Sequence, residues 1–314
     1  MLVNVLFVII GLLLLALGAE GLVRGAGAVA LRLGVAPLVV GLTIVAFGTG
    51  SPELVLSVQA AASGNGGIAL GNVLGSNISN IALVLGVAAL VRPLAVQARL
   101  VRREVPVMIG ASFALFALLV DGELSRLDGA LLLAAAVAYM AFAYLGAKEG
   151  DVPAVTEEFH EVLAEGRRSL WSDVLLVGGG LGALVLGATV LLHGAVAVAT
   201  ELGVSEVVVG LSVIAIGTSL PELATSISAA RRRQADVAFG NAIGSNVFNI
   251  FAVLGVAALV QPIATTGLRP LDVAVFLLSA VLVLPLMARG SVLSRREGAV
   301  LVAGYVAYIL SLAV

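Results

Sequence analysis

A stretch of 54 residues occurs twice in this chain and sets the main constraint on its fold. Residues 41–94 align without a gap with residues 210–263, each position shifted by 169, and 28 of the 54 aligned pairs are identical. The repeated polar residues lie in otherwise apolar surroundings; they are Thr49 and Thr218, Pro52 and Pro221, Glu53 and Glu222, Ser76 and Ser245, and Asn80 and Asn249. Two copies of a polar cluster in an apolar chain indicate one site to which both halves contribute.

The chain is too apolar for a soluble domain. Of its 314 residues, 61% are hydrophobic and 11% are charged, with a mean hydropathy of +1.16, whereas soluble domains are about half apolar and a quarter charged. A spanning helix needs about 20 apolar residues. We therefore expect an all-α integral membrane protein with ten transmembrane helices, near residues 2–23, 36–62, 67–91, 105–120, 128–146, 172–195, 204–229, 237–261, 271–288 and 298–313. The first segment lacks the basic start of a signal peptide, so we expect a retained helix.

The basic residues predict an orientation. If the N-terminus is outside, fifteen Lys and Arg residues fall in cytoplasmic connections and only Arg126 and Arg269 fall outside. Cytoplasmic connections of membrane proteins carry such an excess. We expect a multi-pass protein of the cell membrane with both termini outside. The net charge of −2 gives no reason to expect nucleic acid as a partner.

The repeat divides the chain into two five-helix units, residues 1–146 and 172–314, joined by a cytoplasmic linker at 147–171. An odd number of helices per unit inverts the second unit, so the two polar stretches enter the membrane from opposite sides and meet near its midplane. The linker carries Glu157, Glu158, Glu161 and Glu165. A regulatory Ca²⁺ sensor is one interpretation, but the EF-hand pattern is absent, which favours a plain amphipathic linker.

Glu53 and Glu222 are the strongest candidates for a functional site. A charge near the bilayer centre costs about 2.5 to 3.5 kcal/mol, and each Glu lies deep within an apolar run, which argues against a helix end that reaches water. The preceding GTGSP and GTSLP sequences contain Gly and Pro, which favour a break in the helix. Freed carbonyls, the Thr hydroxyl and the carboxylate are hard oxygen ligands of the kind that Na⁺ and Ca²⁺ prefer.

The second repeated motif is GNVLGSNISN at residues 71–80 and GNAIGSNVFN at 240–249. Its Gly75 and Gly244 permit a further helix break. Ser76 and Asn80 are four residues apart and share one helical face, so both can point at one ion, as can Ser245 and Asn249. Hydrogen bonding between helices is the alternative, and we expect that structural role for the remaining asparagines, Asn72, Asn77, Asn241 and Asn246.

Two carboxylates can neutralise one Ca²⁺, and the same oxygen cage can hold Na⁺ instead. Competition at overlapping sites is a simple basis for exchange. The chain contains no Cys, and its two His residues, His160 and His193, form no Ser/His or HExxH arrangement. We therefore expect no thiolate metal site and no enzyme.

In these two motifs the chain resembles the cation/calcium exchanger superfamily, and in particular its prokaryotic Na⁺/Ca²⁺ exchanger branch, which carries GTSxPE and GNxxGSNxxN in each of two repeats. The resemblance implies a secondary active antiporter that exchanges Na⁺ for Ca²⁺ by alternating access, without a cofactor, with broken helices 2, 3, 7 and 8 around the ions. It also implies a set of ion ligands: Glu53, Glu222, Thr49, Thr218, Ser219, Ser76, Ser245, Asn80 and Asn249, with the carbonyls of Ala46 and Ala215.

The chain departs from the family pattern at Gly50, where the motif has Ser, and by having Asn at both positions 80 and 249, where some members have Asp. Both departures leave the ion stoichiometry open. H⁺/Ca²⁺ exchange and K⁺-dependent exchange remain alternatives, as does, from another class, a cation channel. The sequence also leaves the oligomeric state open.

Two further features carry alternatives. In the family, helices 1 and 6 slide as a gate, and here both are rich in Gly, which equally suits tight static packing. Arg231, Arg232 and Arg233 are either a lipid-binding patch or, more simply, the basic anchor of helix 7.

Overall fold

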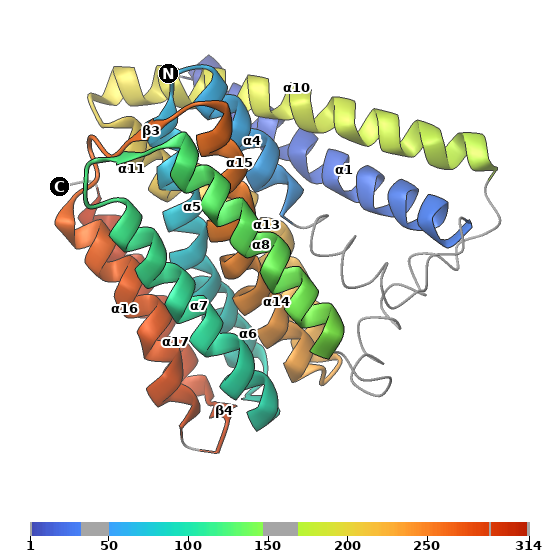
Figure 1. Ribbon diagram of the computed structural model, residues 1–314, viewed down its shortest axis with the longest axis vertical. Coiled ribbons are helices and arrows are strands. Elements are labelled where there is room, and N and C mark those ends of the chain that lie inside the picture. Colours follow the sequence, from blue (N-terminus) through green and yellow to red (C-terminus); the bar gives the residue numbers. More distant parts are fainter. Residues whose placement is uncertain (1, 33–49, 147–168, 289, 313–314) are drawn as a thin grey trace.

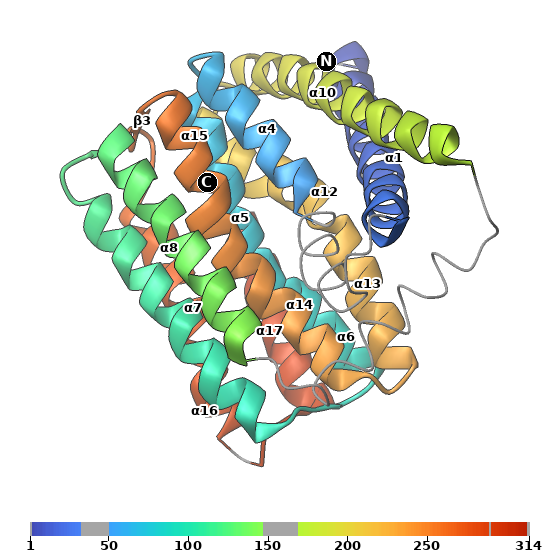
Figure 2. The ribbon, with the colours of Figure 1, turned by 45° about the vertical axis from the view of Figure 1, so that its right-hand side comes forward.

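The computed structural model describes residues 2–32, 50–146, 169–288 and 290–312, which are almost entirely helical (Figure 1). Two long helices, α1 (Leu2–Arg32) and α10 (Leu170–Leu202), lie side by side on one flank in both Figure 1 and Figure 2. The remaining helices form a bundle beside this pair. Residues 33–49 and 147–168, which include Ala46, Thr49 and most of the expected linker, lie outside the described part.

In the first half the bundle consists of α4 (Ser51–Ala62), the continuous run α5 (Gly66–Ser79), η2 (Asn80–Leu85) and α6 (Gly86–Val91), then α7 (Ala98–Leu118) and α8 (Arg126–Gly146). In the second half it consists of α11 (Glu206–Val209), η3 (Gly210–Ile214), α12 (Ala215–Thr218), α13 (Leu220–Arg231), α14 (Ala235–Phe248), η4 (Asn249–Val253), α15 (Leu254–Val260), α16 (Pro270–Met287) and α17 (Arg295–Ser311). The η segments are π-helical.

Several of these helices can cross a membrane. Five are long and apolar enough: Leu2–Ala26, Gly66–Val91, Leu170–Leu202, Ala235–Val260 and Pro270–Met287. The bent pair Glu206–Thr218 and Leu220–Arg231 can form a sixth span. The window in Gly66–Val91 is 83% buried inside the protein and that in Ala235–Val260 is 67% buried, against 28% for the windows in Leu2–Ala26 and Leu170–Leu202. The first two are therefore central, whereas α1 and α10 are peripheral.

Contacts between the halves occur in pairs related by the same shift of 169 residues as the sequence repeat. Strand β1 (Leu94–Ala95) pairs antiparallel with β4 (Val292–Leu293), and β2 (Glu123–Leu124) pairs with β3 (Ile263–Ala264). Gly86 packs against Gly298, and Gly255 packs against Gly129 in the same way. Helices α6 and α17 are thus in contact, as are α15 and α8, so the two halves interlock.

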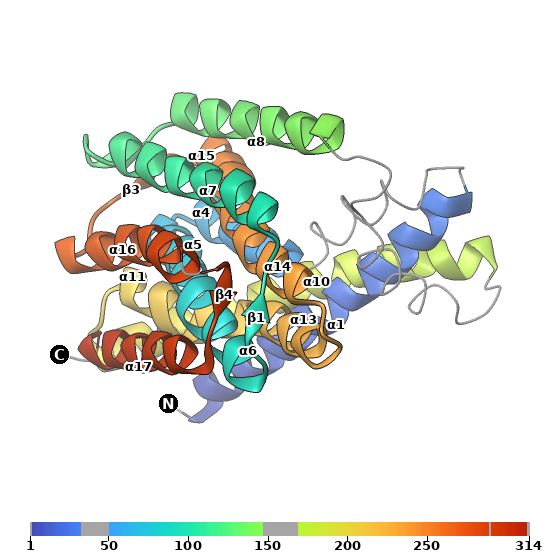
Figure 3. The ribbon, with the colours of Figure 1, turned by 90° about the horizontal axis from the view of Figure 1, so that it is seen from below.

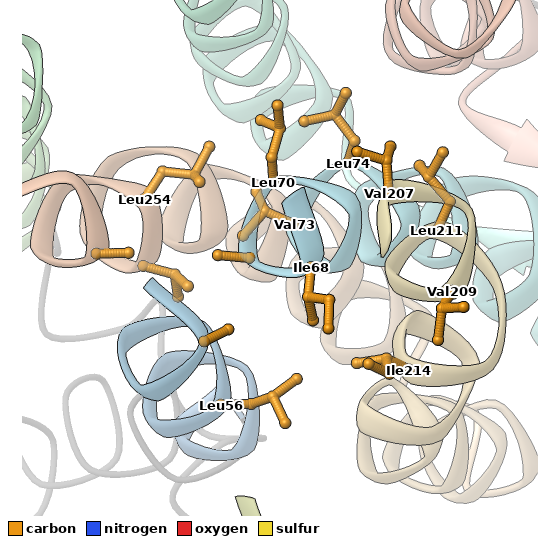
Figure 4. Packing of buried hydrophobic residues seen from close by; sticks show 14 of the residues in the cluster. Leu56, Ile68, Leu70, Val73, Leu74, Val207, Val209, Leu211, Ile214 and Leu254 are labelled. Atoms are coloured by element: carbon orange, nitrogen blue, oxygen red, sulfur yellow. The ribbon is translucent and has the colours of Figure 1, made fainter. Parts of the chain in front are cut away.

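The core is built around α5. Its Ile68, Leu70, Val73 and Leu74 are fully buried among side chains of α4, α11, η3 and α15, as Figure 4 shows. Glycine makes this packing possible, since a Cβ at Gly71 would lie 2.5 Å from the Val207 carbonyl oxygen. Close backbone contact of this kind is typical of helices that pack in membranes.

The expected breaks are found at one place and displaced at another. The helix that carries GTSLPE bends by 43° at Ser219, two residues before Pro221. In the other motif the α-helices continue through Gly75 and Gly244, contrary to the break suggested there. The irregularity comes five residues later, where a π-helical segment begins at Asn80 and at Asn249. A π-helical turn leaves backbone groups displaced without interrupting the span.

Candidate functional site

Glu53 and Glu222 occupy equivalent places in the two halves. Each lies in the first turn of a helix, α4 or α13, directly after a Pro that opens that helix. A helix N-terminus favours negative charge. Both side chains are buried, with 1% exposure, and the two carboxyl groups are close enough to interact electrostatically. The folding of the chain therefore brings the two acidic residues of the repeat together.

Thr218 connects this pair to α5. Its hydroxyl lies 3.1 Å from Asn72 Oδ1 and 3.1 Å from the Ile214 carbonyl oxygen, either of which can accept its one hydrogen, and 3.4 Å from the Ser76 hydroxyl. The Thr218 side chain also contacts Glu53. Thr218, Ser76 and Glu53 thus form one buried polar group drawn from three helices.

Four asparagines from the GNxxGSNxxN motifs form a reciprocal network. Asn77 Nδ2 donates to the Asn246 carbonyl at 3.3 Å, and Asn246 Nδ2 donates to the Asn77 carbonyl at 3.2 Å. Asn80 Nδ2 donates to Asn246 Oδ1 at 3.0 Å, and Asn249 Nδ2 donates to Asn77 Oδ1 at 3.1 Å. Because each bond has a counterpart shifted by 169, the network lies across an approximate two-fold relation.

Several buried oxygen atoms of the expected site residues accept no hydrogen bond from the described part of the chain. Among the described residues, Glu53 Oε2, Ser219 Oγ, Asn80 Oδ1 and Asn249 Oδ1 are buried without a hydrogen-bond partner. The Nδ2 atoms of both asparagines are held by the opposite half, which fixes their amide planes and leaves the Oδ1 atoms available. Buried polar atoms normally have a partner, and a group of acceptor oxygens without donors is the environment that a hard cation requires.

The other expected site residues are placed as follows. Ala215 is buried at the start of α12, and its carbonyl accepts a hydrogen bond from the Ser219 amide at 3.1 Å. Ser245 is half-buried on α14. Thr49 and Ala46 lie outside the described residues. In the described ranges no group of three or more His, Cys, Asp or Glu side chains is found, so the cluster combines two carboxyl groups with neutral oxygens.

Sequence reasoning missed two serines that support the site. Asn72 Nδ2 donates to Ser57 Oγ at 3.0 Å, and Asn241 Nδ2 donates to Ser226 Oγ at 3.1 Å and to the Glu222 carbonyl at 3.2 Å. Ser57 and Ser226 are an identical pair of the repeat, so the alignment contained the signal. Asn72 and Asn241 thus have the supporting contacts expected of them.

A cavity of about 380 Å³ lies between α4 and α10, lined by Gln59, Ser63, Asn65, Thr189, Leu192, His193, Val196 and Ala197. One hydrogen bond crosses between the two helices, from Gln59 Nε2 to Thr189 Oγ1 at 2.6 Å. The same α4 carries Glu53 six residues earlier. The cavity therefore lies at the boundary between the helix that carries Glu53 and α10.

The fold and this buried oxygen cluster define a multi-helical membrane protein of the ion-transporter class. Comparison with known proteins gives the family. The model of the sodium/calcium exchanger protein family matches residues 3–145 and again residues 172–314. The chain belongs to this family.

Relatives extend over the full length. The proposed antiporter CaxA of Alkalimonas amylolytica is 38% identical over 314 residues, covering 98% of each chain. The sodium/calcium exchanger MaX1 of Methanosarcina acetivorans is 32% identical over 351 residues, covering 99% of this chain and 98% of the relative. Among solved structures, the sodium-calcium exchanger NCX_Mj soaked with Na⁺ and Sr²⁺ superposes with a TM-score of 0.66 at 30% identity, covering 98% of both chains.

Proposed function

We propose that this protein is a secondary active antiporter that exchanges Na⁺ for Ca²⁺ across the cell membrane. One observation carries the proposal: Glu53 and Glu222 from opposite halves are buried together, beside oxygen atoms that have no hydrogen donor within the described ranges. Two carboxylates balance the charge of one Ca²⁺. Membership of the sodium/calcium exchanger family supports the same assignment.

The proposed ion ligands are the side chains of Glu53, Glu222, Thr49, Thr218, Ser219, Ser76, Ser245, Asn80 and Asn249, with the carbonyls of Ala46 and Ala215. Hard oxygen ligands suit both Na⁺ and Ca²⁺. Overlapping occupancy makes the two ions compete, and that competition couples their transport. Gly50 supplies no hydroxyl opposite Ser219, so the ligand set is only approximately symmetric.

The proposed architecture is two inverted units of five transmembrane helices, residues 1–146 and 172–314, with the linker and the basic connections in the cytoplasm and both termini outside. The paired contacts shifted by 169 residues support it. The distribution of Arg supports the orientation, because Arg92, Arg231 and Arg295 lie at the β1–β4 end and Arg126 contacts Val260 near β3 at the other. An inverted repeat gives the site one approach from each face.

In this scheme α1 and α10 move together past the bundle. Their contact is made through glycines at seven-residue intervals: Gly11, Gly18 and Gly25 face α10, and Gly180, Gly187 and Gly194 face α1. Both helices are peripheral. Polar contacts join them near each end, from Asn4 to Glu201 and from Arg32 to Asp173. These contacts favour a paired unit.

Ion flux in proteoliposomes tests the proposal. Vesicles loaded with Na⁺ and diluted into Na⁺-free buffer should accumulate Ca²⁺, and Glu53→Gln or Glu222→Gln should abolish uptake because each removes one of two buried negative charges. The matched control is Glu123→Gln, on an exposed strand residue, and it should leave uptake unchanged.

The same vesicles separate the alternatives. Uptake driven equally well by a pH gradient without Na⁺ would replace Na⁺ with H⁺ as the coupling ion, and a requirement for K⁺ would indicate K⁺-dependent exchange. Ca²⁺ entry that needs no counter-ion would contradict antiport and identify a channel.

A further inference from the structure

Three arginines converge on one cavity that the transport site does not use. The cavity has a volume of about 530 Å³ and is lined by Val91, Arg92, Pro93, Arg231 and Arg295. Its walls come from the ends of α6 and α13 and the start of α17. Figure 3 views the protein from the end at which β1, β4, α6 and α13 lie. The volume falls in the range of ligand pockets, about 300 to 1,000 Å³. We call this the arginine cavity.

The arginine cavity carries concentrated positive charge. Among the described residues, no carboxylate lines it, and none of its three arginines forms an ion pair with another of them. Two carboxylates at this end of the protein accept hydrogen bonds from backbone amides. Glu297 accepts from the Ser294 amide at 2.8 Å, and Asp236 accepts from the Gln97 amide at 2.8 Å. Three like charges around one space repel one another, and an anion would relieve that repulsion.

The geometry of the guanidinium groups also suits an anion. Arg295 Nη2 donates to the Val91 carbonyl at 3.3 Å, which holds this side chain against the cavity wall. Arg92 is half-buried, whereas Arg231 and Arg295 are exposed, so the cavity opens to the surface. Guanidinium groups bind phosphate through paired N–H donors and remain charged at all physiological pH values.

The other half of the protein provides an internal comparison. The positions shifted by 169 from Arg92, Arg231 and Arg295 are Gln261, Ala62 and Arg126. There Arg126 Nη2 donates to the Val260 carbonyl at 3.4 Å, as Arg295 does to Val91. The same junction therefore forms with one arginine in place of three. Membrane orientation explains an excess of arginine at one end, but it does not require that three of them share a cavity.

We propose that the arginine cavity binds a phosphate-bearing anion, either the headgroup of an anionic lipid or a soluble phosphate compound. The bound phosphate bridges α6, α13 and α17 and stabilises this end of the bundle. This site is separate from the proposed cation site, and its existence does not depend on the transported ions.

The test variant combines Arg92→Gln with Arg231→Ala, which copies the residues Gln261 and Ala62 of the other junction; we call it the cavity variant. The control is Arg102→Gln combined with Arg296→Gln, which removes the same two charges from exposed positions that do not line the cavity. The unfolding temperature of the full chain in non-ionic detergent is measured as a function of added phosphatidylglycerol, phosphatidylcholine or inorganic pyrophosphate, each tested separately. If the cavity variant does not fold, Arg231→Ala alone takes its place.

We expect an anion to raise the unfolding temperature of the unmodified protein and of the control variant, with at least tenfold weaker apparent binding in the cavity variant. Stabilisation by phosphatidylglycerol but not by pyrophosphate identifies a lipid headgroup, and the reverse identifies a soluble phosphate. The proposal is overturned if neither anion stabilises the protein more than phosphatidylcholine does. It is equally overturned if the control variant loses as much binding as the cavity variant, because the effect is then one of general surface charge.

Discussion

Replacing Asn246 by Ala tests whether the asparagine network positions the cation ligands. Asn246 Oδ1 is the acceptor for Asn80 Nδ2 at 3.0 Å, while Asn80 Oδ1 has no partner among the described residues. Without that acceptor the Asn80 amide can rotate and present its NH₂ group to the cation. Hydrogen bonds between membrane helices contribute about 0.6 kcal/mol on average and up to about 1.7 kcal/mol. Since 1.4 kcal/mol corresponds to a factor of ten, we expect Ca²⁺ affinity to fall by about 3- to 20-fold.

The assay is the external Ca²⁺ concentration that gives half-maximal uptake into Na⁺-loaded proteoliposomes. Asn77→Ala should produce a similar shift, because Asn77 Oδ1 holds Asn249 Nδ2 at 3.1 Å in the equivalent contact. The control is Ser279→Ala. Ser279 is buried, and its hydroxyl donates to the Phe276 carbonyl at 2.7 Å within α16, so the variant loses a buried hydrogen bond without touching the network.

The reasoning fails if Asn246→Ala transports Ca²⁺ with an unchanged half-maximal concentration. It also fails if Ser279→Ala shifts that concentration by as much, because the effect would then follow from general loss of stability.

Two further predictions concern packing and stability. A Cβ at Gly18 would lie 2.7 Å from the Leu184 amide nitrogen, whereas one at Gly182 would meet no described atom within 4 Å. Gly18→Ala should therefore reduce Na⁺-dependent Ca²⁺ uptake at equal protein amounts, and Gly182→Ala should not. Equal uptake by the two variants would contradict the α1–α10 packing. Tyr308 donates to the fully buried Asp272 at 3.0 Å, so Tyr308→Phe should lower the free energy of unfolding by about 1 to 2 kcal/mol, an effect excluded by an unchanged thermal unfolding curve in detergent.

The sequence predicted the composition of the candidate site better than its geometry. Glu53, Glu222, Ser76 and Asn80 stand out because they are polar residues repeated in apolar surroundings. Their spacing does not reveal which half holds which side chain. The exchange of hydrogen bonds between Asn77 and Asn246 depends on how α5 packs against α14, and no local pattern encodes a contact between residues 169 positions apart.

The helix irregularities show the same limit. Glycine marks where a helix can break, which led to an expected break at Gly75 and Gly244. In the structure Gly75 instead permits close packing, since a Cβ there would lie 2.6 Å from the Ala215 Cβ, whereas a Cβ at Gly244 would meet no described atom within 4 Å. The two helices that contain these glycines depart from α geometry five residues later, at Asn80 and at Asn249. A glycine can serve either purpose, and the neighbouring helix decides which.

The sequence by itself determined that the chain enters a membrane, that it contains a duplicated polar stretch and that two acidic residues belong to that duplication. These properties follow from apolar run length, residue identity and the repeat, which are all local. Only the tertiary structure decided that Glu53 and Glu222 are neighbours, that Asn80 and Asn249 keep free oxygens, and that Arg92, Arg231 and Arg295 share a cavity. Each of these three arrangements requires segments that are far apart in the chain to pack together. That packing is determined by the surfaces that many helices bury together, and not by any one segment.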